Sequence, residues 1–409
     1  MKVIHERCAG LDVHKETVVA CARVTTDGKV KQEVRTFGTT TTELLSLADW
    51  LREEEITHAA LESTGVYWKP IWHVLEESLT LVLANAMHIK NVPGRKTDVN
   101  DATWIADLLA HGLIRESFVP PTPVQEMRDL SRTRKQLVRE AAQHVQRIQK
   151  TLEDANLKLA SAVTDLQGKT GRRILQAIVE GQTDPSVLAR LADARIKAPR
   201  KELEEALRGR VRPHHRFLLK LHLEQLDALD KAVRDVEARL GDALKPFRDL
   251  EGLLTTIPGV SVTTAQVILS EIGTDMSRFP SAAHLISWAG LCPGNDESAG
   301  KRRSTRLRKG GQWLKATIVQ SAWAAGRKKG SYLKALFHRI SARRGPKKAA
   351  IAVAASMMTA AYHMLKNGVE YNDLKDTYFD TRDRLSLANR LIKRLNALGL
   401  NVQVQTAVS

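Results

Sequence analysis

Residues 96–102, Lys-Thr-Asp-Val-Asn-Asp-Ala, place two acids three positions apart, directly before residues 103–109, whose apolar residues recur with a helical period. On a helix, positions three apart are surface neighbours, about 5–6 Å apart at Cβ. Asp98 and Asp101 would therefore repel each other unless a positive charge lay between them, and carboxylate oxygens are what Mg²⁺ prefers. Alternatively, Asp98 caps the helix and Asp101 is a solvated first-turn acid, so the pair alone does not establish a metal site.

The sequence before this stretch predicts a mixed α/β sheet. Short apolar or β-branched runs indicate strands, Asp27-Gly28 is typical of a hairpin turn, and the leucine spacing of residues 41–52 indicates a helix. Three strands joined by hairpins, followed by helix, strand, helix, strand and helix, form a mixed sheet. The predicted strands are residues 8–14, 17–24, 30–37, 58–62 and 79–84.

Two of these strands carry an acid. Asp12 lies inside the first predicted strand and Glu62 ends the fourth. A carboxylate in an apolar strand costs several kcal/mol unless it is paired or bound to a metal. Asp12 could pair with His14 or Lys15, and Glu62 could be an exposed strand end. Two strands and one helix that together supply four acids favour a metal site.

The positive charge is concentrated in one window. The chain of 409 residues has a formal charge of +17, and residues 299–350 contain 16 Lys or Arg and no Asp or Glu. A solvated face normally mixes both signs, so a run of one sign favours contact with phosphate.

The cysteine spacing and the hydropathy of the chain argue against several classes of protein. Cys8, Cys21 and Cys292 form no C-x-x-C pair, which argues against zinc and against a disulfide framework. With no signal peptide and no apolar run of spanning length, we expect a cytoplasmic protein.

The remainder of the chain is predicted to be helical. After the prolines at 120–123, residues 138–159 and 219–240 carry apolar residues every seven positions, which predicts two long helices paired in a coiled coil, within the chain or between chains. An ordinary helical core explains the same stripes. Residues 253–265, which contain Pro258-Gly259, resemble a helix-hairpin-helix turn, although Ser261 stands where most such turns have a second glycine.

The order of these features resembles one family over nearly the whole chain. The acids Asp12, Glu62, Asp98 and Asp101, the Pro258-Gly259 turn, residues 290–293 (Gly-Leu-Cys-Pro) and residues 298–301 (Ser-Ala-Gly-Lys) resemble the insertion-sequence one-ten family. These are DEDD transposases related to the Piv invertases, and members act as DNA recombinases guided by a bridge RNA.

The resemblance implies an α/β plus all-α fold with four parts. These are an RNase-H/RuvC-like DEDD domain (1–120), a helical coiled-coil region (121–248), a C-terminal transposase domain with a catalytic serine and a helix-hairpin-helix-like turn (249–370) and a tail (371–409). It implies donor and target DNA and a noncoding bridge RNA as partners, in a homodimer that becomes a tetramer on DNA.

The resemblance also assigns the site residues. The four acids would bind Mg²⁺ or Mn²⁺, and Ser298 would be the nucleophile on DNA. Many members have a second serine downstream, but residues 308–310 here are Arg-Lys-Gly, which leaves Ser298 as the candidate. The residues expected to contact nucleic acid are Lys301, Arg302, Arg303, Arg306, Arg308 and Lys309.

The chemistry agrees with these residue types. A serine hydroxyl needs a base or metal to become nucleophilic, and the phosphodiester needs its developing charge neutralised by cations. Because the acids and Ser298 are far apart in sequence, the site must be composite, in one chain or across a dimer. Two alternatives remain: a RuvC-like nuclease or junction resolvase that uses water, and a basic nucleic-acid-binding scaffold, against which the intact acid set argues.

Overall fold

The computed structural model describes residues 2–63, 65–85, 89, 100–294, 296–304, 306–307, 310–382 and 384–400, with the backbone alone for residues 296–298, 302–303 and 385–387. The chain forms two compact units, residues 1–119 and 120–409.

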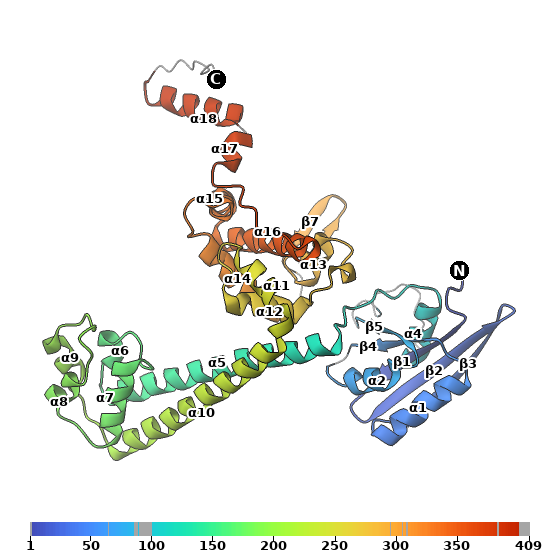
Figure 1. Cartoon of the computed structure of the whole chain (residues 1–409), viewed down its shortest axis with the longest axis horizontal. Coiled ribbons are helices and arrows are strands. Elements are labelled where there is room, and N and C mark those ends of the chain that lie inside the picture. The colour runs from blue at the N-terminus through green and yellow to red at the C-terminus, as the bar shows by residue number, and fades with distance from the viewer. Residues whose placement is uncertain are drawn as a thin grey trace. The chain divides into compact units, whose positions relative to one another are not determined.

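The first unit is a five-stranded mixed sheet in the order β3-β2-β1-β4-β5 (Figure 1). β1 and β2 pair antiparallel, as do β2 and β3, whereas β1, β4 and β5 are parallel neighbours. This confirms the predicted mixed α/β sheet and is compatible with an RNase-H-like domain. The elements are β1 (Arg7–Val13), β2 (Thr17–Thr26), β3 (Lys29–Gly38), α1 (Thr41–Glu53), β4 (His58–Glu62), α2 (Trp68–Leu75), β5 (Thr80–Ala84) and α4 (Asp101–Ala110).

The sheet is covered on both faces, as its apolar strands require. On one face Leu11 and Leu61 pack in a core with Leu47 and Leu51 of α1. The opposite face packs against α4, which closes a second small core. The turn between β2 and β3 has φ of 50° at Asp27 and 75° at Gly28, the left-handed values of a type I′ hairpin.

The second unit begins with two long helices, α5 (Thr122–Asp154) and α10 (Pro213–Ala243). Arg134 of α5 pairs with Glu237 of α10, and Asp154 pairs with His215, so the two helices are antiparallel (Figure 1). The predicted long helices thus pack against each other within one chain.

The heptad prediction holds only in part. Leu152 and Leu219 are buried between the helices, whereas Val138 is 44% exposed. α5 ends before Leu159, because Asn156 has a left-handed φ of 56° that interrupts the helix. Leu159 instead begins α6 and packs in a core formed by the far ends of the two helices and the short helices between them. These are α6 (Leu159–Ala162), α7 (Lys169–Val179), α8 (Pro185–Arg190) and α9 (Arg200–Ala206).

Further helices follow α10 and carry one hairpin. Tyr362 of α16 is buried and donates a hydrogen bond to the Phe279 carbonyl at 3.0 Å, which ties this last long helix to the rest. The elements are α11 (Arg248–Thr255), α12 (Val262–Ile272), α13 (Ala282–Trp288), β6 (Asp296–Ser298), β7 (Lys301–Ser304), α14 (Gln312–Ala325), α15 (Tyr332–Arg344), α16 (Pro346–Asn367), α17 (Tyr378–Arg382) and α18 (Arg384–Ala397), with 3₁₀ turns at Lys245–Phe247 and Met276–Arg278.

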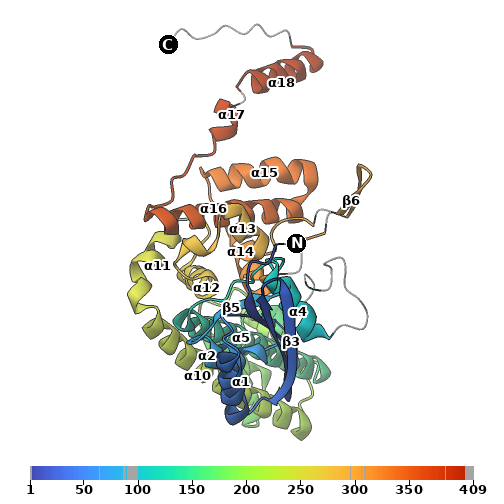
Figure 2. The same ribbon diagram turned by 90° about the vertical axis from the view of Figure 1, so that its right-hand side faces the viewer.

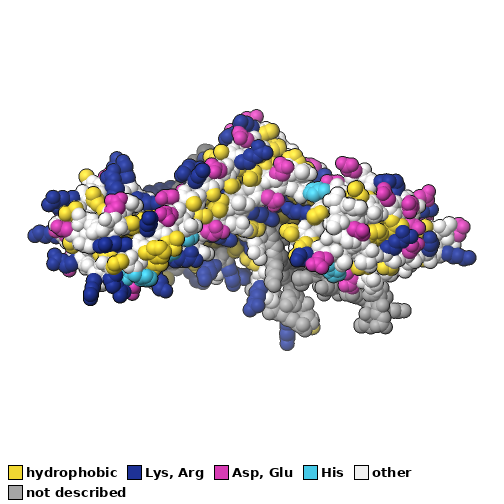
Figure 3. Space-filling view, turned by 90° about the horizontal axis from the view of Figure 1, so that it is seen from below, with side chains coloured by type: hydrophobic (Ala, Val, Ile, Leu, Met, Phe, Trp, Pro, Cys, Tyr) yellow, Lys and Arg dark blue, Asp and Glu magenta, His cyan; other side chains and the backbone are white. Residues whose placement is uncertain are grey.

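Lys and Arg side chains stand over much of the surface in Figure 3, with apolar side chains between them. On the paired α5 and α10 the large exposed apolar side chains include Val138, Phe217 and Leu221. Across the described ranges, no helix combines the length and hydrophobicity needed to cross a membrane.

Candidate active site and basic cavity

Asp12 and Glu62 lie side by side at the same edge of the sheet. Leu11 of β1 is paired in register with Leu61 of β4, and the two strands are parallel. The next residue in each strand is an acid, so both carboxylates follow their strands to the same face and the same end. Both side chains are partly exposed, as a site open to substrate requires.

The face that carries these acids is the one covered by α4. A Cβ on Gly10 would lie 2.1 Å from the Ala102 carbonyl oxygen, so the helix backbone touches the sheet at this glycine. Asp12 is two residues further along β1 and therefore faces the same side. The Cys8 thiol contacts the Ala106 carbonyl at 3.6 Å, so α4 runs antiparallel to β1 and its first turn lies toward Asp12.

Asp101 is the first residue of α4, which brings it to the same end of the sheet as Asp12 and Glu62. The helix is capped by Asn100, whose side chain accepts a hydrogen bond from the Ala102 N–H at 3.0 Å. The alternative in which Asp98 caps the helix is therefore wrong, because Asn100 takes that place. Asp98 itself lies outside the described residues.

An ion pair holds α4 in position. The Arg23 side chain on β2 is 4% exposed and its Nε donates to the Asp107 carboxylate of α4 at 2.8 Å. A buried guanidinium that lost this partner would be strongly destabilised, so the pair fixes the helix on the sheet.

The carboxylates fit a hard divalent cation. Asp12 has one described partner, since the His14 Nε2 lies 3.1 Å from its Oδ2, as one sequence alternative anticipated. The His14 side chain is 59% exposed and that of Asp12 18%, so a cation could displace the imidazole from its solvent side. Within the described part of the chain, no three His, Cys, Asp or Glu side chains form a metal-binding group. Three oxygen donors at one edge are nevertheless the ligand type that Mg²⁺ and Mn²⁺ take.

Ser298 belongs to the second unit and ends β6. Residues 296–304 form a β-hairpin, in which Ser298 pairs with Lys301. Ala299 and Gly300 have φ of 51° and 73°, so the turn is a tight type I′ turn, which suits Gly at its second position. In Figures 1 and 2 the hairpin projects beyond the neighbouring helices.

Of the basic residues predicted to contact nucleic acid, Lys301 and Arg306 are exposed on or beside this hairpin. The backbone of Arg302 and Arg303 lies in β7. Arg308 and Lys309 lie outside the described residues.

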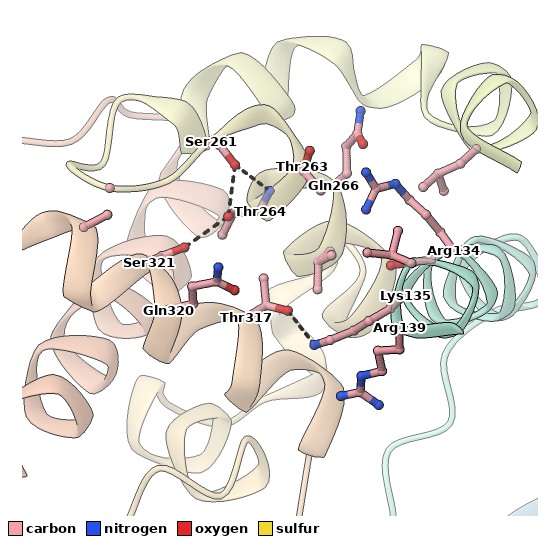
Figure 4. A pocket seen from close by; sticks show the side chains of 16 residues that line it. Arg134, Lys135, Arg139, Ser261, Thr263, Thr264, Gln266, Thr317, Gln320 and Ser321 are labelled. Atoms are coloured by element: carbon pink, nitrogen blue, oxygen red, sulfur yellow. Dashed lines mark hydrogen bonds between the residues drawn. The ribbon is translucent and has the colours of Figure 1, made fainter. Parts of the chain in front are cut away.

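A second group of cations was not singled out from the sequence. Arg134, Lys135 and Arg139 of α5 line a cavity of about 500 Å³ together with residues of α12 and α14 (Figure 4). Lys135 and Arg139 are four apart on one helix, which is the only sign of this cluster in the sequence. The walls contributed by α12 and α14 come from residues more than a hundred positions later.

Comparison with known proteins gives two family matches. Residues 9–157 match the IS110 DEDD family described as "Transposase", and residues 251–338 match the family described as "Transposase IS116/IS110/IS902 family".

Two relatives come from Streptomyces coelicolor. The chain is 39% identical over 100 residues to an uncharacterized 43.6 kDa protein of the insertion element IS110, which is 24% of either chain. It is 26% identical over 264 residues to a protein of the IS117 mini-circle, which is 57% of this chain and 63% of the relative. The matches thus cover less than two thirds of either relative.

Proposed function

Because this chain belongs to the IS110 family of transposases, we propose that it is a DNA-cleaving and rejoining enzyme that moves an insertion sequence. The observation that carries the proposal is the placement of Asp12, Glu62 and Asp101 at one edge of one sheet face. A scaffold that only bound phosphate would have no use for carboxylates gathered at one end of a sheet, because they repel a polyanion.

In this proposal Asp12, Glu62, Asp98 and Asp101 hold Mg²⁺ or Mn²⁺. The bound cation would stabilise negative charge on the phosphodiester and lower the pKa of the attacking hydroxyl. The chain's own residues support this site: Gly10, which has no side chain, lets α4 approach β1 closely, and the Arg23–Asp107 pair holds the helix there.

The proposed nucleophile is the hydroxyl of Ser298. Its oxygen forms a bond to phosphorus while the bond from phosphorus to one strand end breaks, and that end leaves as a hydroxyl that takes up the proton. Attack by a strand hydroxyl on the phosphoserine reverses the step, so the ester conserves the energy of the broken bond without ATP. Basic residues beside the hairpin, including Lys301 and Arg306, would stabilise the transition-state charge.

The finer architecture and partners belong to the same proposal. We assign residues 1–120 to an RNase-H/RuvC-like domain, 121–248 to a coiled-coil region, 249–370 to a transposase domain with a helix-hairpin-helix turn and 371–409 to a tail. A structured bridge RNA would select donor and target DNA. The exposed Phe217 and Leu221 on α10 offer apolar area for a dimer, which would become a tetramer on DNA.

The direct test is to trap the full chain on nicked target DNA, digest it and search by mass spectrometry for nucleotide on the peptide that contains Ser298. We expect an adduct in the unaltered protein and none in Ser298→Ala, which should still bind nucleic acid. Ser304→Ala, on the same hairpin, is the matched control and should keep the adduct. An adduct on Ser304 would move the nucleophile.

The same variants distinguish the phosphoserine reaction from the alternative reaction, in which water attacks the DNA. A RuvC-like nuclease that activates water would cleave DNA without any protein adduct. Strand cleavage by Ser298→Ala at the rate of the unaltered protein would therefore establish the water-using nuclease and refute the phosphoserine step.

A further inference from the structure

The charged side chains that line the cavity formed by α5, α12 and α14 are all positive. Its lining contains three cationic side chains and eight neutral polar ones, and no Asp or Glu (Figure 4). Three cations that line one space repel each other, and this cost is reduced by carboxylates or by a bound anion.

Within the described ranges, one of the three cations has a carboxylate partner. Arg134 pairs with Glu237 of α10 at 2.6 Å. Lys135 instead donates from its Nζ to the Trp313 carbonyl oxygen at 3.2 Å and to the Thr317 hydroxyl at 3.0 Å, both neutral. Among the described residues, Lys135 and Arg139 have no Asp or Glu within salt-bridge distance. Two positive charges of the cavity are thus left for a ligand.

These two cations are held in place by an aromatic ring. The Lys135 ammonium lies 5.9 Å and the Arg139 guanidinium 5.4 Å from the centre of the Trp313 ring. Cation–π contact orients a long side chain without neutralising its charge. Lys135 and Arg139 are therefore preorganised beside the cavity, which reduces the entropy that a ligand would have to overcome.

The opposite wall is the first turn of α12, a helix of 11 residues. Ser261 caps this helix and accepts a hydrogen bond from the Thr264 N–H at 3.2 Å, and the Thr264 hydroxyl contacts the Ser321 hydroxyl at 3.0 Å. Thr263 and Gln320 also line the space and supply neutral donors. The positive end of the helix dipole adds to the charge of Lys135 and Arg139 across the cavity.

Burial makes the unpaired charge costly. Desolvation, followed by repulsion from Arg139, lowers the pKa of Lys135, and attraction to the Glu271 carboxylate offsets these effects only in part. An anion in the cavity would offset both effects. The exposed Arg139 and Val138 lie at the margin, so the cavity is continuous with the surface and can admit part of a long polymer.

We propose that this cavity binds a phosphodiester of a nucleic-acid backbone, held between Lys135 and Arg139 on one side and the first turn of α12 on the other. The proposal rests on the proposed function, since it assumes a nucleic-acid substrate or guide. The two cations that it assigns to this contact lie outside the basic window 299–350. DNA and RNA share this chemistry, and the experiment distinguishes them.

The test compares two variants of equal charge in the full chain. Lys135→Gln/Arg139→Gln removes the two unpaired charges, and Lys150→Gln/Lys231→Gln removes two exposed charges elsewhere on α5 and α10. Binding of labelled duplex DNA and of single-stranded RNA is measured over a range of salt concentrations. The cavity variant should lose at least about tenfold in affinity for one polymer, and its salt slope should fall by roughly 0.9 per lost contact on duplex DNA or 0.7 on a single strand.

A third variant tests the same cavity without removing Lys135 or Arg139, in case Lys135→Gln/Arg139→Gln does not fold. Thr263→Glu puts an acid in the first turn of α12, where it stabilises the helix through the dipole but repels phosphate. Its melting temperature should be unchanged or higher while binding is weakened.

The outcomes separate this inference from the proposed function. Loss confined to the DNA arm or to the RNA arm identifies the polymer. If the cavity variants bind both polymers as tightly as the Lys150→Gln/Lys231→Gln control, the inference is refuted. If the unaltered protein binds neither polymer, the proposed function itself fails.

Discussion

Replacement of Gly10 by alanine tests whether the contact between β1 and α4 positions the acids. The added methyl would lie 2.1 Å from the Ala102 carbonyl oxygen and 2.4 Å from the Ala106 nitrogen, both backbone atoms. A Cβ essentially never comes closer than 3.0 Å to such an atom, so α4 has to withdraw from the sheet. Asp101, at the start of α4, would withdraw with it.

The size of the effect follows from this overlap. Overpacking a close-packed interface costs about 1–3 kcal/mol. Here the neighbours are backbone, which cannot rotate away, so we expect the upper part of this range. A cost of about 2–3 kcal/mol raises the opening equilibrium of α4 by roughly 30- to 150-fold, since about 1.4 kcal/mol corresponds to a factor of ten.

Hydrogen exchange followed by mass spectrometry on the full chain measures this directly. Peptides that cover residues 101–110 should exchange faster in Gly10→Ala, while peptides of α10 should be unchanged. DNA cleavage should fall together with the lost protection. Gly38→Ala is the matched control, because its nearest neighbour, at 3.1 Å, is the flexible Glu43 side chain. Unchanged protection of residues 101–110 in Gly10→Ala would refute the reasoning.

Four further outcomes are expected. Asp101→Asn removes a charge without changing volume, so strand cleavage should be lost at unchanged melting temperature, and wild-type recombination would exclude this acid from the site. Gly259 has a φ of 87° and would place a Cβ 2.5 Å from the Ser321 carbonyl, so Gly259→Ala should lower the unfolding free energy by more than about 1 kcal/mol in denaturant titration. Gly252 lies within α11 with nothing within 4 Å, so Gly252→Ala should instead stabilise the chain by about 0.5–1 kcal/mol in the same assay. The Nδ1 atoms of His144 and His222 lie 3.2 Å apart, and burial lowers the pKa of both. Since the unfolded chain binds more protons, the stability of the α5–α10 pair should be greatest above about pH 6.5 and fall on acidification through the folded pKa values, and a melting temperature that rose on acidification would contradict this.

Local sequence determined the elements of the N-terminal unit. Apolar runs of strand length predict β1, β4 and β5, because a strand buried on both faces leaves little room for polar residues, whereas the largely exposed β3 was predicted as the return strand of a hairpin. Asp27-Gly28 predicts its hairpin, because a type I′ turn requires left-handed φ at both positions. The acids near the ends of β1 and β4 could also be identified from the sequence, because burying an unpaired carboxylate in an apolar strand costs free energy and therefore indicates a function.

Tertiary structure decided which distant segments meet, because local sequence patterns do not specify their partners. A heptad stripe is satisfied equally by a helix of the same chain or of another, and only the fold shows that α5 packs on α10 of the same chain. Asn100 rather than Asp98 caps α4, because the helix begins where it meets Gly10 of the sheet. The basic cavity draws its walls from Lys135, Ser261 and Thr317, which no local spacing connects. Sequence thus determined the features that depend on neighbouring residues, whereas those that depend on distant segments meeting in space were decided by packing alone.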